Sequence, residues 1–243
     1  MRLITLNIWG GHIREPLIEF IKSRKDTDIF CLQEVYHEAP ESICTLDDFE
    51  VSLKIFSEMH EFLPDHVPFF RPVLANSYGI GMLVHKRLDV VGEGEVGIHH
   101  NPNCIGRGPA HSRKLQWLRC RSANQDYAVM NVHGSWNGRG KTDSPERIAQ
   151  SKSIREFMDT LQMPKVLCGD FNLRPDTQSM EILETGMTNL IKTHQIKSTR
   201  TSFYDKEEGF ADYVLTSPEI MVKHFEVLQD EVSDHAPLLV DFV

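Results

Sequence analysis

Eight short apolar segments, each of strand length, recur along the chain and constrain its fold more than any other feature. They are RLITLNI (2–8), DIFCLQE (28–34), GIGMLVH (79–85), KLQWLRC (114–120), YAVMNVH (127–133), KVLCG (165–169), ADYVLTS (211–217) and APLLVDF (236–242). Most are rich in β-branched residues and bounded by Gly, Pro, Asn or Asp, which is typical of strands. Some alternate with polar residues and others are apolar throughout. This mixture predicts two sheets packed face to face, with helices outside.

Two longer segments have helical periodicity. Residues 14–24 place Leu17, Ile18, Ile21 and the nearby Phe20 on one face, with Pro16 in the first turn. Residues 143–162 begin with Ser144 as a predicted N-cap and Pro145 as the first helical residue. An apolar stripe follows, made of Ile148, Ile154, Phe157, Met158 and Leu161. No internal repeat or linker is visible, so we expect one domain spanning residues 1–243.

The composition limits the class of protein. A chain of 243 residues with 40% hydrophobic content can bury a sizeable core. Its 26 Lys and Arg against 35 Asp and Glu leave a formal charge of −9, which argues against a broad basic face for nucleic acid. A nuclease whose basic groups are local is not excluded by this charge.

The cysteines and apolar runs bear on the compartment. The five cysteines, at 31, 44, 104, 120 and 168, are odd in number and have no C-x-x-C spacing. This pattern favours reduced thiols over disulfides or a zinc site. The apolar start is too short for a signal peptide, and no run approaches the ~18 apolar residues of a membrane span. We therefore expect a cytoplasmic protein without a membrane span.

Polar residues gather at the ends of the predicted strands. They are Asn7, Glu34, His133, Asp170, Asn172, Asp212, Asp234 and His235. Each alone has an ordinary explanation, as a turn residue, a solvated strand end or a core histidine. Together they would require several coincidences. The oxygen ligands Asn7, Glu34 and Asp234 suit Mg²⁺ or Mn²⁺, and a cation beside histidines and an additional Asp is what hydrolysis of a phosphate ester requires.

The motifs LNIWG, LQE, GDFN, ADYVLTS and SDHAPL, in this order, resemble the endonuclease/exonuclease/phosphatase superfamily. This superfamily includes pancreatic deoxyribonuclease, apurinic endonucleases, poly(A) deadenylases, neutral sphingomyelinases and inositol-polyphosphate 5-phosphatases. The similarity extends from Asn7 to His235. It implies a deoxyribonuclease I-like four-layer α/β/β/α sandwich, with two central mixed sheets and the site at one edge of them.

The resemblance also implies a role for each residue at the site. Asn7 and Glu34 should hold the metal, with Asp234 in or beside its coordination shell. Asp170 is expected to activate water, and Asn172 to orient the phosphate or the nucleophile. His235 should donate to the phosphoryl oxygens, while Asp212 keeps its imidazole oriented and protonated. His133, where apurinic endonucleases lead to a tyrosine, should contact the scissile phosphate or assist the leaving group.

Three further residues concern the substrate. Arg113 in HSRKLQW resembles a phosphate-contacting Ser-Arg of pancreatic deoxyribonuclease. Trp136 and Asn137 follow His133 on the long loop 134–144, where an exposed Trp would stack on a base. A Trp packed under the loop is the alternative. Arg107, Arg139 and Lys141, on the loops 99–113 and 134–144, form either a local basic rim or a solvated set of charges.

These observations predict a monomeric Mg²⁺-dependent phosphodiesterase, with Mn²⁺ as an alternative cation. Its expected substrate is a nucleotide or a short or single-stranded nucleic acid, and no protein partner is indicated. Two alternatives stay open: a phosphatase or phosphodiesterase acting on a small-molecule or lipid phosphoester, and a non-catalytic binding module with the same fold. The chain lacks the Cys-Asp-Arg sequence of inositol 5-phosphatases, which counts against inositol phosphates.

Overall fold

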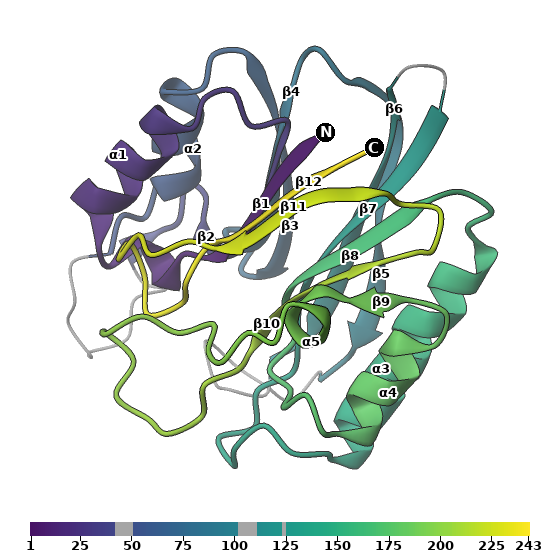
Figure 1. Ribbon diagram of the computed structural model, residues 1–243. Coiled ribbons are helices and arrows are strands. Elements are labelled where there is room, and N and C mark those ends of the chain that lie inside the picture. Colours follow the sequence, from purple (N-terminus) through teal and green to yellow (C-terminus); the bar gives the residue numbers. More distant parts are fainter. Residues whose placement is uncertain (42–50, 102–110, 123–124) are drawn as a thin grey trace.

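Two six-stranded sheets form the centre of the molecule in a computed structural model, which describes residues 1–41, 51–101, 111–122 and 125–243 (Figure 1). The first sheet has the order β11-β12-β1-β2-β4-β3. Its strands are β1 (Arg2–Asn7), β2 (Ile29–Tyr36), β3 (His66–Leu74), β4 (Tyr78–His85), β11 (Val222–Val227) and β12 (Leu238–Phe242). The second sheet has the order β5-β6-β7-β8-β10-β9. Its strands are β5 (Asp89–His99), β6 (Arg113–Ser122), β7 (Gln125–His133), β8 (Lys165–Asp170), β9 (Thr188–Asn189) and β10 (Asp212–Thr216).

Helices cover the outer face of each sheet. Helices α1 (Arg14–Ser23) and α2 (Ile55–Glu61) lie on one side of the molecule, together with the 3-10 turn η1 (Trp9–Gly11). Helices α3 (Pro145–Thr160), α4 (Gln178–Glu184) and α5 (Leu190–Thr193) lie on the side of the second sheet (Figure 1). Both sheets mix parallel and antiparallel pairs. The predicted four-layer α/β/β/α sandwich is therefore confirmed.

The eight strands predicted from the sequence are the eight interior strands of the two sheets. The sequence does not predict β3, β5, β9 and β11, which are the edges. An interior strand between packed layers is buried on both faces, so it forms a continuous apolar run. Edge strands tolerate residues that weaken this signal: β3 contains Pro68 and Pro72, and β5 contains Gly92, Gly94 and Gly97.

The helix beginning at Pro145 follows its predicted start, but its buried face is more polar than the sequence suggests. The Ser144 hydroxyl accepts a hydrogen bond from the backbone nitrogen of Arg147 at 3.3 Å. Ile154 and Met158 are buried as expected, whereas Ile148 is only half-buried. The other buried residues of this helix are Arg147, Gln150 and Ser151. Hydrophobic periodicity does not detect Arg147 and Gln150, whose side chains form hydrogen bonds with the loop 134–144.

A buried polar contact joins the two sheets. The side-chain nitrogen of Gln33 on β2 donates to Oδ1 of Asn131 on β7 at 2.6 Å. The Asn131 amide nitrogen donates in turn to the backbone oxygens of Leu32 at 3.1 Å and Gly81 at 3.2 Å. Because an unpaired amide inside the core would be costly, this contact selects one register of the second sheet over the first.

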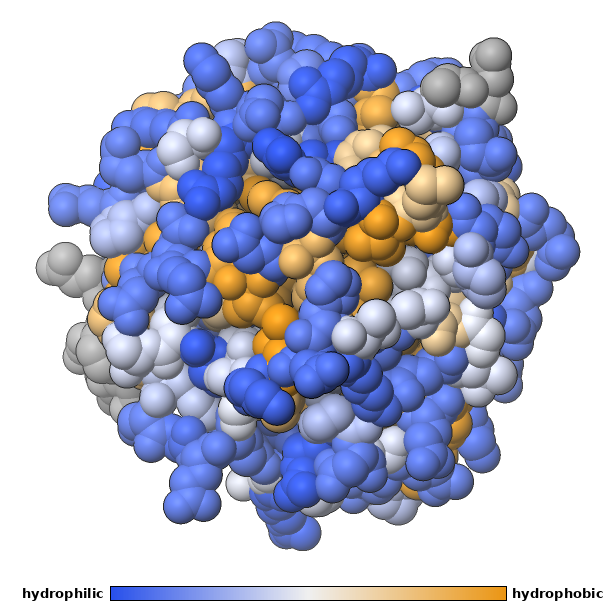
Figure 2. Space-filling view, viewed as in Figure 1, coloured by the Kyte–Doolittle hydropathy of each residue, from blue (hydrophilic) through white to orange (hydrophobic). Residues whose placement is uncertain are grey.

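The remaining sequence expectations concern cysteines, membrane segments and surface. Cys31, Cys120 and Cys168 are buried and free, while Cys44, Cys104 and Arg107 lie outside the described residues. Within the described part of the chain, no helix is both long and apolar enough to cross a membrane. Figure 2 shows mainly hydrophilic residues over the visible face, with hydrophobic residues gathered towards its middle. This surface agrees with the high content of charged residues.

Gly169 directly precedes the strand-end residue Asp170, and its backbone leaves no room for a side chain. Its φ is +130°, and an added Cβ would lie 2.1 Å from the backbone oxygen of Val132. We expect Gly169→Ala to lower the free energy of unfolding by about 2–4 kcal/mol in urea denaturation. The matched control is Gly97→Ala, since no atom lies within 4 Å of the added Cβ there. A similar loss in both variants would contradict this account.

Candidate active site

Strand register places three polar side chains in a row at one end of the second sheet. β7 and β8 are parallel, with His133 opposite Asp170, and β8 and β10 are antiparallel, with Asp170 opposite Asp212. Each residue is the last or first of its strand, and all three are buried. The sequence predicts that these residues belong to strand ends, and the register determines that they are neighbours.

The first sheet contributes Asn7 and Glu34 to the same place. Asn7 ends β1, and Glu34 lies on β2 where the pairing with β4 shifts between Leu32 and Val35. Glu34 has a positive φ of 58°, an uncommon conformation for a residue other than glycine, and a bulge of this kind redirects a side chain. The Asn7 amide nitrogen donates to Glu34 Oε1 and to Asp170 Oδ2, each at 3.0 Å. Asn7 thus connects the carboxylates of the two sheets.

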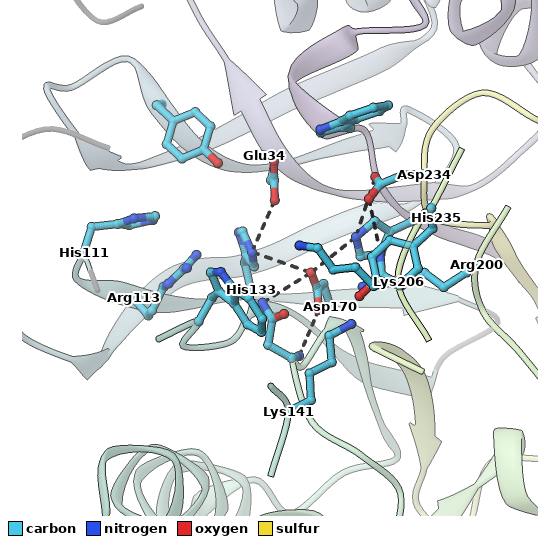
Figure 3. Close-up of a pocket in the computed structure, with 15 residues that line it drawn as sticks. Glu34, His111, Arg113, His133, Lys141, Asp170, Arg200, Lys206, Asp234 and His235 are labelled. Carbon is cyan, nitrogen blue, oxygen red and sulfur yellow. Dashed lines mark hydrogen bonds and ion pairs between the residues drawn. The ribbon is translucent and has the colours of Figure 1, made fainter. Parts of the chain in front are cut away.

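The segment before β12 adds His235. Its Nδ1 lies 2.8 Å from both carboxylate oxygens of Asp212, and its Nε2 lies 3.8 Å from Asp170 Oδ2 (Figure 3). Thr199 donates its hydroxyl to Asp212 Oδ2 at 3.0 Å, and a backbone bridge pairs Arg200 with His235. The segment between α5 and β10 therefore fixes both members of the Asp-His pair.

Asp234 lies beside this pair and also contacts the guanidinium group of Arg200. Its Oδ1 is 3.8 Å from His235 Nε2, and its Oδ2 accepts a hydrogen bond from Arg200 Nη1 at 3.4 Å. The Arg200 guanidinium stacks on the Tyr204 ring at 3.9 Å. The structure thus brings Asp234 next to His235, with Arg200 on its other side.

Within the described residues, two groups place potential metal-ligating atoms within 4.8 Å of one another: Glu34, His133 and Asp170 in one, and Asp170, Asp212 and His235 in the other. Asp234 belongs to neither group. Asn7 turns its amide nitrogen toward the carboxylates, and its oxygen accepts a hydrogen bond from the Trp9 backbone nitrogen at 3.0 Å. The ligand set of Asn7, Glu34 and Asp234 stays a prediction.

The electrostatics at Glu34 and His133 fit a divalent cation. Burial raises the pKa of the Glu34 carboxyl, and the neighbouring Asp234 raises it further. Burial, reinforced by Arg113, holds the pKa of His133 well below its usual value, so this imidazole is neutral near pH 7. Carboxylates and a neutral imidazole are the forms that bind metal, and a cation would relieve the crowding of negative charge.

At His235 and Asp170, neighbouring charges outweigh the effect of burial on the pKa. Burial alone would lower the pKa of His235, but the Asp212 carboxylate, together with Asp234 and Asp170, outweighs it and raises the pKa above its ordinary value. Burial alone would raise the pKa of Asp170, but His235, with lesser contributions from His133 and Lys141, brings it well below its usual range. Asp170 is therefore a carboxylate that faces an imidazole whose pKa is raised.

Asn172 supports Asp170 from the adjoining turn. It adopts a positive φ of 52°, a conformation that asparagine tolerates better than most residues. Its backbone nitrogen donates to Asp170 Oδ1 at 2.8 Å, and its amide nitrogen donates to the Gly134 oxygen at 3.3 Å. These bonds orient the Asp170 carboxylate and hold the Asn172 amide at the edge of the same cavity.

A cavity of about 290 Å³ gathers most of these side chains (Figure 3). Of the residues singled out from the sequence, those that line it are Glu34, Arg113, His133, Trp136, Lys141, Asp170, Asn172, Asp234 and His235. Asn7 and Asp212 lie behind this wall, where they contact its carboxylates and imidazole. Asn137 instead lines a neighbouring cavity of about 660 Å³, and Trp136 lines both.

Sequence reasoning does not find the other residues of this wall. They are Trp9, Tyr78, His111, Arg200, Tyr204 and Lys206. Arg200, Tyr204 and Lys206 come from the segment between α5 and β10, which has no strand-end pattern to mark it. The available signal is compositional: cationic and aromatic residues alternate in TRTSFYDK, between two recognised motifs.

The fold is that of the deoxyribonuclease I-like α/β sandwich proteins. A family model described as Endonuclease/Exonuclease/phosphatase family matches residues 4–235. The chain therefore belongs to the endonuclease/exonuclease/phosphatase family, whose members are generally metal-dependent phosphoesterases. A sequence search of curated proteins finds no match.

Several solved structures share the fold across the whole chain. A mannosyl-6-phosphatase of Bacteroides thetaiotaomicron is 18% identical, with a TM-score of 0.79 and coverage of 100% of this chain and 99% of that one. A humanized D. rerio TDP2 is 14% identical, with a TM-score of 0.74 and coverage of 100% and 98%. The human Nocturnin catalytic domain is 17% identical, with a TM-score of 0.71 and coverage of 100% and 94%. At these identities the likeness establishes the fold.

The contact between Asp212 and His235 predicts the effect of removing one negative charge. In the Asp212→Asn variant the pKa of His235 should fall from above 6.5 to below it, because burial then dominates. NMR titration of the imidazole without added metal measures this change. Asp176→Asn is the control, since Asp176 pairs with Arg174 in an exposed position. An unchanged His235 titration in Asp212→Asn would refute the assignment.

The lowered pKa of Lys141 predicts a pH-dependent contribution to the free energy of unfolding. Burial, reinforced by Arg200, lowers the pKa of Lys141 from 10.5 to about 8. Between these values the unfolded chain binds more protons than the folded protein, so wild-type stability should rise with pH relative to Lys141→Met. Since each pH unit corresponds to about 1.4 kcal/mol, the difference should change by about 2–3 kcal/mol across the window. Urea denaturation of both proteins from pH 8 to 10.5 measures it, and a constant difference would contradict the lowered pKa.

Proposed function

We propose that the protein is a divalent-metal-dependent hydrolase that cleaves a phosphate ester by direct attack of water. One observation supports this most strongly: a single cavity is lined by Glu34, His133, Asp170 and His235. The pKa values of His133 and Asp170 are lowered there, whereas the pKa of His235 is raised. A buried carboxylate, a neutral imidazole and a protonated imidazole in one place supply a base, a neutral ligand or donor, and a cationic donor.

Glu34 is the main carboxylate that would hold the cation, with Asn7, Asp170 and Asp234 around it. A bound Mg²⁺ or Mn²⁺ would stabilise the negative charge that develops on the phosphoryl oxygens. No nucleophilic side chain is needed, because Asp170 is ionised and accepts the proton of the attacking water.

The other polar residues act on the phosphate. The His235 imidazolium donates Nε2–H to a phosphoryl oxygen, while its Nδ1–H is held by Asp212. His133 contacts the scissile phosphate or the leaving oxygen, and Asn172 orients the phosphate beside Asp170. Arg113 lines the same wall and adds positive charge.

For the substrate we propose a nucleotide or the end of a short, single-stranded nucleic acid. Trp136 is half-buried and lines both cavities, and its ring would stack on a base. Asn137 lines the second cavity and would contact the next part of the substrate. The net charge of −9 disfavours tight binding along a duplex. The free cysteines agree with a reducing compartment such as the cytoplasm.

A small phosphomonoester is the second candidate substrate. The cavity of about 290 Å³ is at the lower end of the range for small-ligand sites. One of the similar structures is named as a mannosyl-6-phosphatase, which agrees with such a substrate. The chemistry assigned to Asp170 and His235 is the same for either substrate.

The proposed hydrolysis predicts loss of activity in two variants. With Mg²⁺ or Mn²⁺, the wild-type protein should hydrolyse bis(p-nitrophenyl) phosphate or members of a panel of oligonucleotides and phosphomonoesters. Asp170→Ala and His235→Ala should each lose about 100-fold or more in kcat/KM, because each removes a proton-transfer group or a charged donor. Chelation of the metal should abolish the wild-type rate.

Asp176→Ala serves as the control, since Asp176 is exposed and lies outside the cavity lining. Circular dichroism should show that all three variants are folded. Metal-dependent activity that survives in both Asp170→Ala and His235→Ala would overturn the mechanism. A folded wild-type protein without activity toward the whole panel would overturn the proposed hydrolase.

A further inference from the structure

We infer that the substrate carries a second phosphate group close to the scissile one, and that Lys141, Arg200 and Lys206 bind it. The inference rests on the proposed phosphoester hydrolysis and adds a substrate class to it. All three cations line the cavity of the candidate active site, and none is needed for the chemistry assigned to Asp170 and His235. In Figure 3, Lys141 approaches from the side opposite Glu34, while Arg200 lies beside Asp234 and His235.

Arg200 is the anchor of this group. Its side chain is 6% exposed, which is unusual for an arginine on a loop, and its guanidinium is fixed by Tyr204 at 3.9 Å and by Asp234 at 3.4 Å. Its buried Nε has no hydrogen-bond partner among the described residues. A buried guanidinium with an unsatisfied donor is costly unless a ligand completes it, and a phosphate oxygen suits its geometry.

Lys141 shares the aromatic ring with Arg200. Its ammonium lies 5.3 Å from the centroid of Tyr204 and donates to the Phe210 backbone oxygen at 3.0 Å. Lys141 is buried, and an ammonium has three donors, of which this contact uses one. Burial, reinforced by the nearby Arg200, lowers the pKa of Lys141 to about 8. A bound anion would stabilise both.

Lys206 extends the group toward the opening. It is exposed, and its ammonium lies 5.7 Å from the centroid of the Trp136 ring. The three cations therefore reach from the half-buried Tyr204 to the half-buried Trp136. A phosphate bound between them would place an attached base or sugar next to the indole.

The charge of the cavity favours a substrate with more than one phosphate. Four cationic side chains, Arg113, Lys141, Arg200 and Lys206, line it with three carboxylates, Glu34, Asp170 and Asp234. A divalent cation would increase this positive excess further, whereas the charge of a protonated His235 is balanced by the Asp212 carboxylate. A single diester carries one negative charge and leaves most of the excess uncompensated. A second phosphate supplies the missing charge at the side where Lys141, Arg200 and Lys206 converge.

Two synthetic substrates test the inference directly. The p-nitrophenyl ester of thymidine 5′-phosphate and its 3′-phosphorylated form release the same chromophore and differ by one phosphate. With free Mg²⁺ held in excess, we expect the wild-type kcat/KM to be roughly tenfold or more higher for the 3′-phosphorylated form, the effect of one or two charge-assisted hydrogen bonds. Lys206→Gln and Lys141→Met should each reduce this ratio at least several-fold.

Lys223→Gln removes the same charge on β11, away from the cavity, and should keep the ratio and both rates unchanged. The ratio separates a binding role from a structural one, because a folding defect lowers both rates together. Equal wild-type kcat/KM values for the two substrates would overturn the second phosphate site, as would variants that lower both rates equally. Failure to hydrolyse either ester, bis(p-nitrophenyl) phosphate or any member of the panel of oligonucleotides and phosphomonoesters would instead overturn the proposed function, and the inference with it.

Discussion

The face-to-face packing of the two sheets is the constraint on which the candidate site depends. Glu34 comes from the first sheet, and His133 and Asp170 come from the second. A shift of one residue in the register of a strand would turn these side chains to the opposite face of the sheet. The buried hydrogen bond of 2.6 Å between Gln33 and Asn131 lies one residue before Glu34 and two before His133, so it fixes the sheets where their polar ends meet. Apolar packing alone would tolerate several arrangements.

Neighbouring charges then shift the pKa values of buried groups of similar chemistry in different directions. His133 and His235 are both buried within reach of Asp170, yet their pKa values shift in opposite directions. The difference lies in their other neighbours, since Arg113 acts on His133 and the Asp212 carboxylate contacts His235. One imidazole is neutral and the other is cationic at the same pH. The same principle leaves Asp170 ionised although it is buried.

The sequence predicts the fold well where burial on both faces produces continuous apolar runs. This is why the interior strands were predictable, whereas β3 and β5, with their prolines and glycines, were not. Helix α3 shows the same limit, because its start follows from Ser144 and Pro145 while the burial of Arg147 follows from contacts with a distant loop. Local chemistry encodes caps and strand cores, but partners distant in sequence determine which polar residues are buried.

The sequence by itself determined the family and most of the residues of the candidate site, because the strand-end motifs specify the chemical types of these residues and their order along the chain. Only the tertiary structure decided how these residues are grouped. It placed Asp170 between His133 and His235, turned Asn137 toward a second cavity, and brought Arg200 to Asp234. The physical reason is that these contacts depend on strand register and on loops between sheets. Such contacts join residues far apart in the chain, so no local pattern encodes them.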